Sequence, residues 1–69
     1  MLLAMTALVQ GFSELDLRNM MTSAMNLHED HEPGRWVVET THESRPWAVV
    51  VEPDAVDDLL VVITAYPVA

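Results

Sequence analysis

Three runs of β-branched and aromatic residues in the second half of the chain constrain the fold more than any other feature. They are RWVVETT (35–41), PWAVVVE (46–52) and LLVVITAY (59–66). Such residues favour extended strands. The links between them, HESR (42–45) and PDAVDD (53–58), are short, and short links force neighbouring strands to pair antiparallel. The sequence therefore predicts a three-stranded antiparallel meander.

Neither face of this predicted sheet is polar, although a half-buried strand normally alternates apolar and polar residues. If 42–45 is the hairpin loop, Thr41 lies opposite Pro46, and the register assigns every strand residue to a face. The first face would carry Trp36, Val38, Thr40, Trp47, Val49, Val51, Leu60, Val62, Thr64 and Tyr66, and the second would carry Arg35, Val37, Glu39, Ala48, Val50, Glu52, Leu59, Val61, Ile63 and Ala65. We expect the N-terminal segment or a second chain to cover what one helix leaves exposed.

A helix is predicted from about 14 to 26, within GFSELDLRNMMTSAMN (11–26). Ser13 is a suitable N-cap and Asp16, three residues later, completes a capping box. Phe12 and Leu17 have the spacing of a hydrophobic staple. One buried stripe then follows helical spacing through Leu17, Met20, Met21, Ala24 and either Met25 or Leu27.

The N-terminal segment MLLAMTALVQ (1–10) is too short to span a bilayer. It also lacks the basic region and cleavage pattern of a secretion signal. We expect a short apolar helix or strand from about 2 to 9 that docks on the core of a cytoplasmic protein. The predicted fold class is α+β, with one or more N-terminal helices packed on the meander in a single domain, 1–69.

The segment LHEDHEPG (27–34) is rich in metal-ligating residue types, and His42 follows on the next strand. Zinc proteases need two histidines four apart on a stable helix. His28 and His31 are three apart and run into Pro33. The sequence therefore predicts a solvated loop, with no metal and no cofactor.

The charge of the chain bears on its partners. Eleven acids stand against three arginines and no lysine, for a formal net charge of −8. Such a chain is repelled by nucleic-acid phosphates and by acidic membrane surfaces. A chain of 69 residues without cysteine also has a small core and no disulfide to support it. Both observations favour a protein partner or a second subunit.

Several motifs between 11 and 67 resemble a known family: GFSELDLR at the helix start, EPGRWVVET, RPW, VVEPD and LVVITAYP. They are similar to a small bacterial domain family of unknown function that is grouped with the RelE/ParE and BrnT toxins, in the barnase–EndoU–colicin–RelE class of ribonuclease-like folds. The resemblance implies helices packed on an antiparallel sheet. It also implies candidate catalytic residues for RNA cleavage, at Arg35, His42, Thr64 and Tyr66, with Arg45 as a further cation.

The chain departs from this family before the helix. A segment bearing histidine and arginine is expected there, and MLLAMTALVQ has no ionisable side chain. The first hypothesis is therefore a binding or assembly module with a toxin-like fold but no intact catalytic site. It would form a homodimer or bind a protein partner, with Val37, Val50, Val61 and Ile63 at the interface. The alternative is a toxin-type ribonuclease neutralised by an antitoxin, which the acidic charge disfavours.

Overall fold

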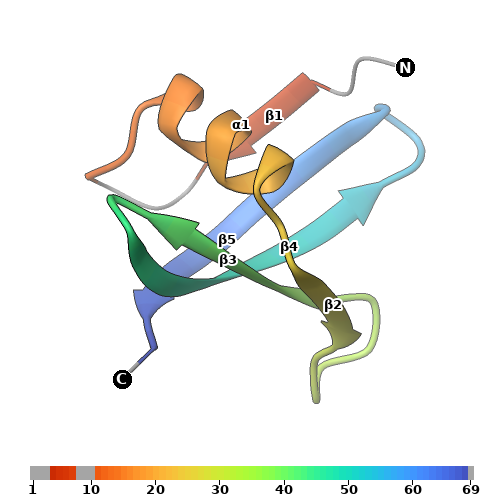
Figure 1. The fold of residues 1–69 in the computed structure, drawn as a ribbon. Helices are drawn as coiled ribbons and strands as arrows, with labels where there is room; N and C mark the ends of the chain where they lie inside the picture. The colour runs from red at the N-terminus through yellow and green to blue at the C-terminus, as the bar shows by residue number, and fades with distance from the viewer. Residues whose placement is uncertain (1–3, 8–10, 69) are drawn as a thin grey trace.

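The computed structural model describes residues 4–7 and 11–68. Its elements are β1 (Ala4–Ala7), α1 (Glu14–Thr22), β2 (Asn26–Glu29), β3 (Trp36–His42), β4 (Arg45–Asp54) and β5 (Leu59–Pro67). The strands form one sheet in the order β1-β5-β4-β3-β2, in which β1 is parallel to β5 and the other neighbours are antiparallel (Figure 1). The α+β class and the β3–β4–β5 meander are confirmed.

The predicted number of strands is wrong, and of the one or more helices predicted the structure describes one. Within the described ranges the sheet has five strands and the chain has one helix. β1 is the strand form of the expected N-terminal element, whose ends at 2–3 and 8–9 lie outside the described residues. β2 comes from a segment predicted to be the end of the helix and the beginning of a loop. Its register, with Leu27 opposite Val38, extends the sheet beyond β3.

The predicted capping box is present at the N-terminus of α1. The Asp16 N–H donates to Ser13 Oγ at 3.0 Å, and the Ser13 N–H donates to Asp16 Oδ2 at 3.1 Å. The helix ends at Thr22 rather than Asn26, and the Met25 N–H already donates to the Glu39 carbonyl at 2.8 Å. The predicted stripe is therefore correct for Leu17 and Met20, which are buried, but wrong for Ala24, Met25 and Leu27, which are exposed.

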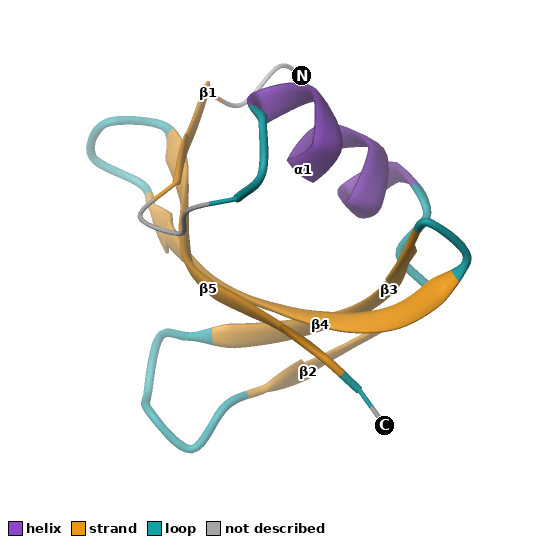
Figure 2. Ribbon diagram, turned by 90° about the vertical axis from the view of Figure 1, so that its left-hand side faces the viewer, coloured by secondary structure: helices purple, strands orange, loops and turns teal. Residues whose placement is uncertain are grey.

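The core lies between α1 and one face of the sheet. Leu17 and Met20 pack there against Val38, Val49, Val51 and Val62, and Phe12, Trp36, Trp47, Leu60 and Ala65 pack at the margin. The sheet curves around the helix (Figure 2). This curvature lets a helix of nine residues cover the middle of one face. A smaller cluster of Val37, Ala48 and Val50, with Ile63 beside it, lies on the opposite face.

The hairpin between β3 and β4 is tighter than predicted. Thr41 pairs with Pro46 as expected, but His42 also pairs with Arg45, so the loop is only Glu43 and Ser44. Both loop residues have positive φ, 51° and 63°. This is the geometry of a two-residue hairpin turn that Asn-Gly or Asp-Gly normally signals. Because Glu43 and Ser44 are neither Asn nor Gly, the sequence lacks this signal for a two-residue turn.

A bulge in β5 changes which face its last residues occupy. Val51 pairs with Val62, whereas Val50 pairs with Thr64, so Ile63 is one extra residue in the ladder. An extra residue reverses the alternation that follows it. Thr64 and Tyr66 therefore lie on the face away from α1, and Ala65 lies on the helix face. The predicted faces of these three residues are wrong.

One buried hydrogen bond joins the helix to the sheet. Thr40, at 1% exposure, donates its hydroxyl hydrogen to the Met20 carbonyl. Carbonyls in the last turn of a helix have no partner inside the helix. A side chain on β3 thus supplies the missing donor and fixes the helix on the strand.

We expect Thr40→Val to reduce the free energy of unfolding by about 1–3 kcal/mol, because it leaves a buried carbonyl without a donor while conserving side-chain shape. Urea denaturation measures the loss. Thr41→Val, at the next position of the same strand, is the control and should change stability by much less. Equal losses in the two variants would contradict the assigned role of Thr40.

Candidate functional site

The sheet face that points away from α1 is the candidate site, and we call it the open face. Two rows of paired residues cross it from β5 to β2 and a third row joins β5 to β4, because alternate residues of a strand share a face. Its members are Asn26, His28, Arg35, Val37, Glu39, Ala48, Val50, Glu52, Val61, Ile63, Thr64 and Tyr66. Within the described part of the chain, the single helix packs on the other side of the sheet.

Polar and charged side chains on the open face are paired with each other. Arg35 Nε lies 3.4 Å from Glu52 Oε2, and His28 Nδ1 lies 3.4 Å from Glu39 Oε2. Asn26 Nδ2 donates to the same Glu39 oxygen at 3.1 Å. The two carboxylates flank Val37, Ala48 and Val50, which are 3–6% exposed. The middle of the open face is therefore shielded from water by side chains of its own sheet.

The four residues predicted at the interface differ in exposure. Val37 and Val50 are buried at 6% each within the single chain, whereas Val61 and Ile63 are half-buried. Tyr66 on the same face is 46% exposed. The apolar surface that the open face offers to a partner therefore lies along β5.

A groove runs beside Val61 and Ile63 where β4 and β5 meet their connecting loop. Glu52, Pro53, Asp54 and Ala55 complete its lining, and its volume is about 470 Å³. Asp54 Oδ1 accepts the N–H groups of Val56 at 3.1 Å and Asp57 at 3.2 Å. These bonds hold the loop that forms one rim of the groove.

The structure places three of the four predicted catalytic residues on one face, in different rows of the sheet. Arg35, Thr64 and Tyr66 share the open face, but His42 lies on the helix face at the opposite end of β3. Seven residues of extended strand separate His42 from Arg35, about 23 Å. The histidine on the open face is His28, which was predicted to be in a loop. The four-residue strand β2 is too short for periodicity to reveal it.

His42 instead belongs to an aromatic cluster that holds the helix start to the hairpin. Its ring centroid lies 5.0 Å from that of Phe12 and 6.0 Å from that of Trp47, and the Phe12 and Trp47 centroids are 5.1 Å apart. All three pairs are edge-to-face, the arrangement that aromatic rings prefer. Phe12 thus packs at the sheet end from the position before the helix cap.

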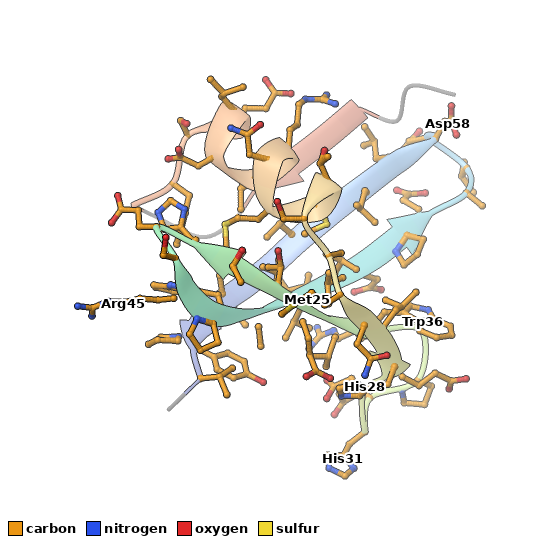
Figure 3. The ribbon with its side chains drawn as sticks, in the orientation of Figure 1. Met25, His28, His31, Trp36, Arg45 and Asp58 are labelled. Carbon is orange, nitrogen blue, oxygen red and sulfur yellow. The ribbon has the colours of Figure 1, made fainter. Side chains whose placement is uncertain are left out.

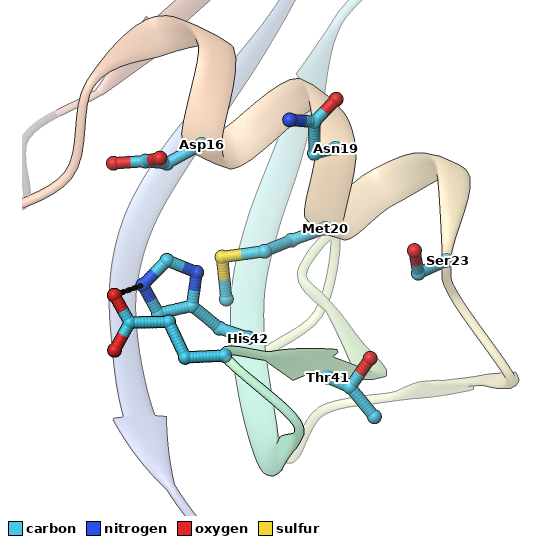
Figure 4. Close-up of a pocket in the computed structure, with 7 residues that line it drawn as sticks. Asp16, Asn19, Met20, Ser23, Thr41 and His42 are labelled. Atoms are coloured by element: carbon cyan, nitrogen blue, oxygen red, sulfur yellow. Dashed lines mark ion pairs between the residues drawn. The ribbon is translucent and has the colours of Figure 1, made fainter.

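A second hollow, the hairpin cleft, lies between α1 and the β3–β4 hairpin (Figure 4). Asp16, Asn19 and Ser23 form its helix wall, at spacings of three and four that place them on one stripe. Thr41, His42 and Glu43 form the other wall, and Met20 lies between the walls. The cleft has a volume of about 340 Å³. His42 Nε2 and Glu43 Oε1 are 3.8 Å apart.

Two further findings concern metal binding and membrane-spanning helices. Among the described residues, no three side chains of His, Cys, Asp or Glu lie close enough to hold a metal ion. His31 points away from the sheet at the tip of its loop (Figure 3). No helix of the described chain has the length and apolarity needed to cross a membrane.

Comparison with known proteins gives no relative: no family model, no curated protein and no solved structure matches the chain.

Asp16 in the hairpin cleft provides a pH-dependent test of the helix cap. The Ser13 N–H and then the Ser13 hydroxyl lower the pKa of Asp16 below its ordinary value of 3.8, with a smaller effect from nearby His42. A lowered folded-state pKa stabilises the fold above the unfolded-state value, and the stabilisation disappears as pH falls through the folded-state pKa. We therefore expect Asp16→Asn to be less stable than wild type at pH 7. The difference should shrink as the pH falls below 3.8.

Chemical denaturation of the two proteins at several pH values measures this effect. Asp57→Asn in the β4–β5 loop is the control, since Asp57 lies outside the helix cap. A difference for Asp16→Asn that does not change with pH would contradict the assigned charge effect.

Proposed function

We propose that this chain is a small acidic binding module that acts through protein–protein contacts made by its open face. The observation that carries the proposal is the unequal cover of the two faces of the sheet. Leu17 and Met20 cover the centre of the helix face, whereas no helix of the described chain covers the open face, where Val61, Ile63 and Tyr66 leave apolar surface accessible. Contiguous accessible apolar surface on a soluble chain is typical of an interaction site.

The charges of the chain favour a protein over a nucleic acid as the partner. Two of the three arginines lie near a carboxylate: Arg18 is 3.0 Å from Glu14 and Arg35 is 3.4 Å from Glu52. Arg45 extends into solvent beyond the hairpin (Figure 3). The arginines therefore do not form the basic patch that phosphate binding requires.

The edge strand β2 is less suited to binding than the open face. It has only four residues, and its Leu27 N–H donates to Asn26 Oδ1 at 2.9 Å. An edge strand binds another chain through its unpaired backbone groups. The Asn26 side-chain oxygen accepts one of these N–H groups, that of Leu27, and the Asn26 side-chain nitrogen donates to Glu39 Oε2. This arrangement favours contact through the face over strand addition at β2.

A ribonuclease is the second candidate function. It is favoured by the common placement of Arg35, Thr64 and Tyr66 on the open face, beside the His28–Glu39 pair. A base, an acid and a cation on one surface are the groups that metal-independent RNA cleavage uses. The proposed relationship to RelE- and BrnT-type toxins agrees with this candidate. The net charge of −8 and the Arg35–Glu52 pair weigh against it.

Placing a positive charge on the open face tests the first function. We expect Ile63→Lys to abolish binding of a protein partner, or self-association if the partner is a second copy, because lysine would be desolvated at the contact. Sedimentation at micromolar concentration measures self-association. For a different partner, affinity capture followed by titration of the purified partner measures binding.

Glu43→Lys, which makes the same kind of change at the hairpin tip, is the matched control. It should leave binding intact, and both variants should keep the circular dichroism spectrum of the wild type. A partner that binds Ile63→Lys and wild type equally well would contradict a role for the open face.

RNA binding separates the two functions. We expect no sub-micromolar binding of a short single-stranded RNA at about 150 mM salt, because the acidic chain repels a polyanion. Fluorescence anisotropy measures it. If the chain nevertheless cleaves RNA, we expect Arg35→Ala and His28→Ala to lose activity and His42→Ala to keep it, since His42 lies on the other face. Tight RNA binding by the wild type would favour the ribonuclease over the binding module.

A further inference from the structure

We infer that the groove lined by Glu52, Pro53, Asp54, Ala55, Val61 and Ile63 is the docking point for a basic, extended segment of a partner protein. In this arrangement an apolar side chain of the partner contacts Val61 and Ile63, and its lysine or arginine side chains lie against the acids at the rim. The inference rests on the proposed function and specifies the chemistry of the partner.

The floor of the groove is apolar and continuous with a buried cluster. Ile63 packs against Val37, Ala48 and Val50, so its inner side is already in contact with buried side chains. Its remaining surface and that of Val61 are accessible, since both residues are half-buried. A volume of about 470 Å³ is within the range of sites that hold small ligands. The groove is thus large enough for apolar side chains that enter from outside.

The spacing of the floor residues favours an extended occupant. Val61 and Ile63 are two positions apart on β5, about 6.6 Å along the strand. Side chains two positions apart in an extended segment have the same separation. Alternate residues of such a segment can therefore contact Val61 and Ile63, while the residues between them point toward the acidic rim or solvent.

The charge at this end of the sheet specifies a basic occupant. Glu52 and Asp54 line the groove, and Asp57 and Asp58 follow in the adjoining loop. Figure 3 places Asp58 at this end of the molecule, far from Arg45 at the hairpin. Arg35 is the arginine near the groove, 3.4 Å from Glu52. Two carboxylates thus line the groove and two more follow in the adjoining loop, with one guanidinium nearby, and complementary charge steers a basic partner toward this end.

The same charge argues against a second copy of the chain as the occupant. Two copies joined through the groove would bring the carboxylates of both rims together, and juxtaposed like charges disfavour association. The rim is also held in place before binding, because Asp54 accepts the N–H groups of Val56 and Asp57. A preformed rim reduces the ordering required when a partner binds.

Three synthetic hexapeptides test the inference: alternating valine and lysine, alternating serine and lysine, and alternating valine and glutamate. Each is titrated into the ¹⁵N-labelled full chain while backbone amide shifts are followed. We expect the valine–lysine peptide to shift the amides of Val61, Ile63 and Glu52, the serine–lysine peptide to bind at least tenfold more weakly, and the valine–glutamate peptide not to bind. Equal binding of the two lysine peptides, or shifts that do not centre on the groove, would overturn the inference.

Two sets of variants probe the floor and the rim separately. Val61→Thr combined with Ile63→Thr should weaken the valine–lysine peptide at least tenfold, whereas Leu15→Thr, at a 67% exposed leucine on α1, should not. Asp57→Asn combined with Asp58→Asn should weaken binding and reduce its salt dependence. Glu43→Gln, at the hairpin tip, is the control. If the threonine variant does not fold, the rim variant and the peptide comparison decide the question.

The inference and the proposed function fail in different ways. A homodimer in sedimentation that Ile63→Lys dissociates would support binding through the open face and overturn a basic partner. A neutral or acidic protein partner that binds the wild type but not Ile63→Lys would also support binding through the open face and overturn a basic partner. A protein partner unaffected by Ile63→Lys would contradict the proposed function, whatever the peptides show.

Discussion

The packing of one short helix on a curved sheet is the constraint on which the rest of the structure depends. Among the described residues, α1 is the single helix, and its nine residues pack on a sheet of five strands. Leu17 and Met20 fill the centre of the concave face against Val49 and Val62, all of them 0–1% exposed. Thr40 and the Phe12 cluster then fix both ends of the helix on the sheet. No other element of the described ranges forms a layer on the other face.

The open face is kept compatible with water by its own charged side chains. The Arg35–Glu52 and His28–Glu39 pairs are both partly exposed, and such pairs add little to the free energy of folding. Their main effect is to shield from water the valines at the centre of the face, which they surround. This cover does not extend to Val61 and Ile63 on β5. The contact that we propose for the open face thus lies along β5, beyond these pairs.

The two ends of the molecule differ in what they expose. At the hairpin end, His42 is packed between Phe12 and Trp47, and the polar stripe of α1 faces the hairpin cleft. At the opposite end, the β4–β5 loop concentrates carboxylates around an apolar floor. The first end serves mainly to hold the helix on the sheet. The second end combines accessible apolar surface with uncompensated charge, the two components of a specific interface.

The sequence by itself determined those features that depend on neighbours along the chain. Ser13 and Asp16 specify the helix start through local hydrogen bonds, and the β-branched runs specify β3, β4 and β5. The pairing of Thr41 with Pro46 and the apolar character of both faces follow from the same local pattern.

Only the tertiary structure decided the features that depend on distant partners. β2 exists because Asn26–Glu29 pairs with β3, a contact that outweighs the helical spacing of Met25 and Leu27. The bulge at Ile63 moved Thr64 and Tyr66 to the other face, because one extra residue reverses strand alternation and leaves no mark in composition. His28 took a place on the open face because register between strands determines which residues of different strands share a surface. His42 is separated from Arg35 because β3 continues through His42, and seven positions along one strand place the two side chains on opposite faces.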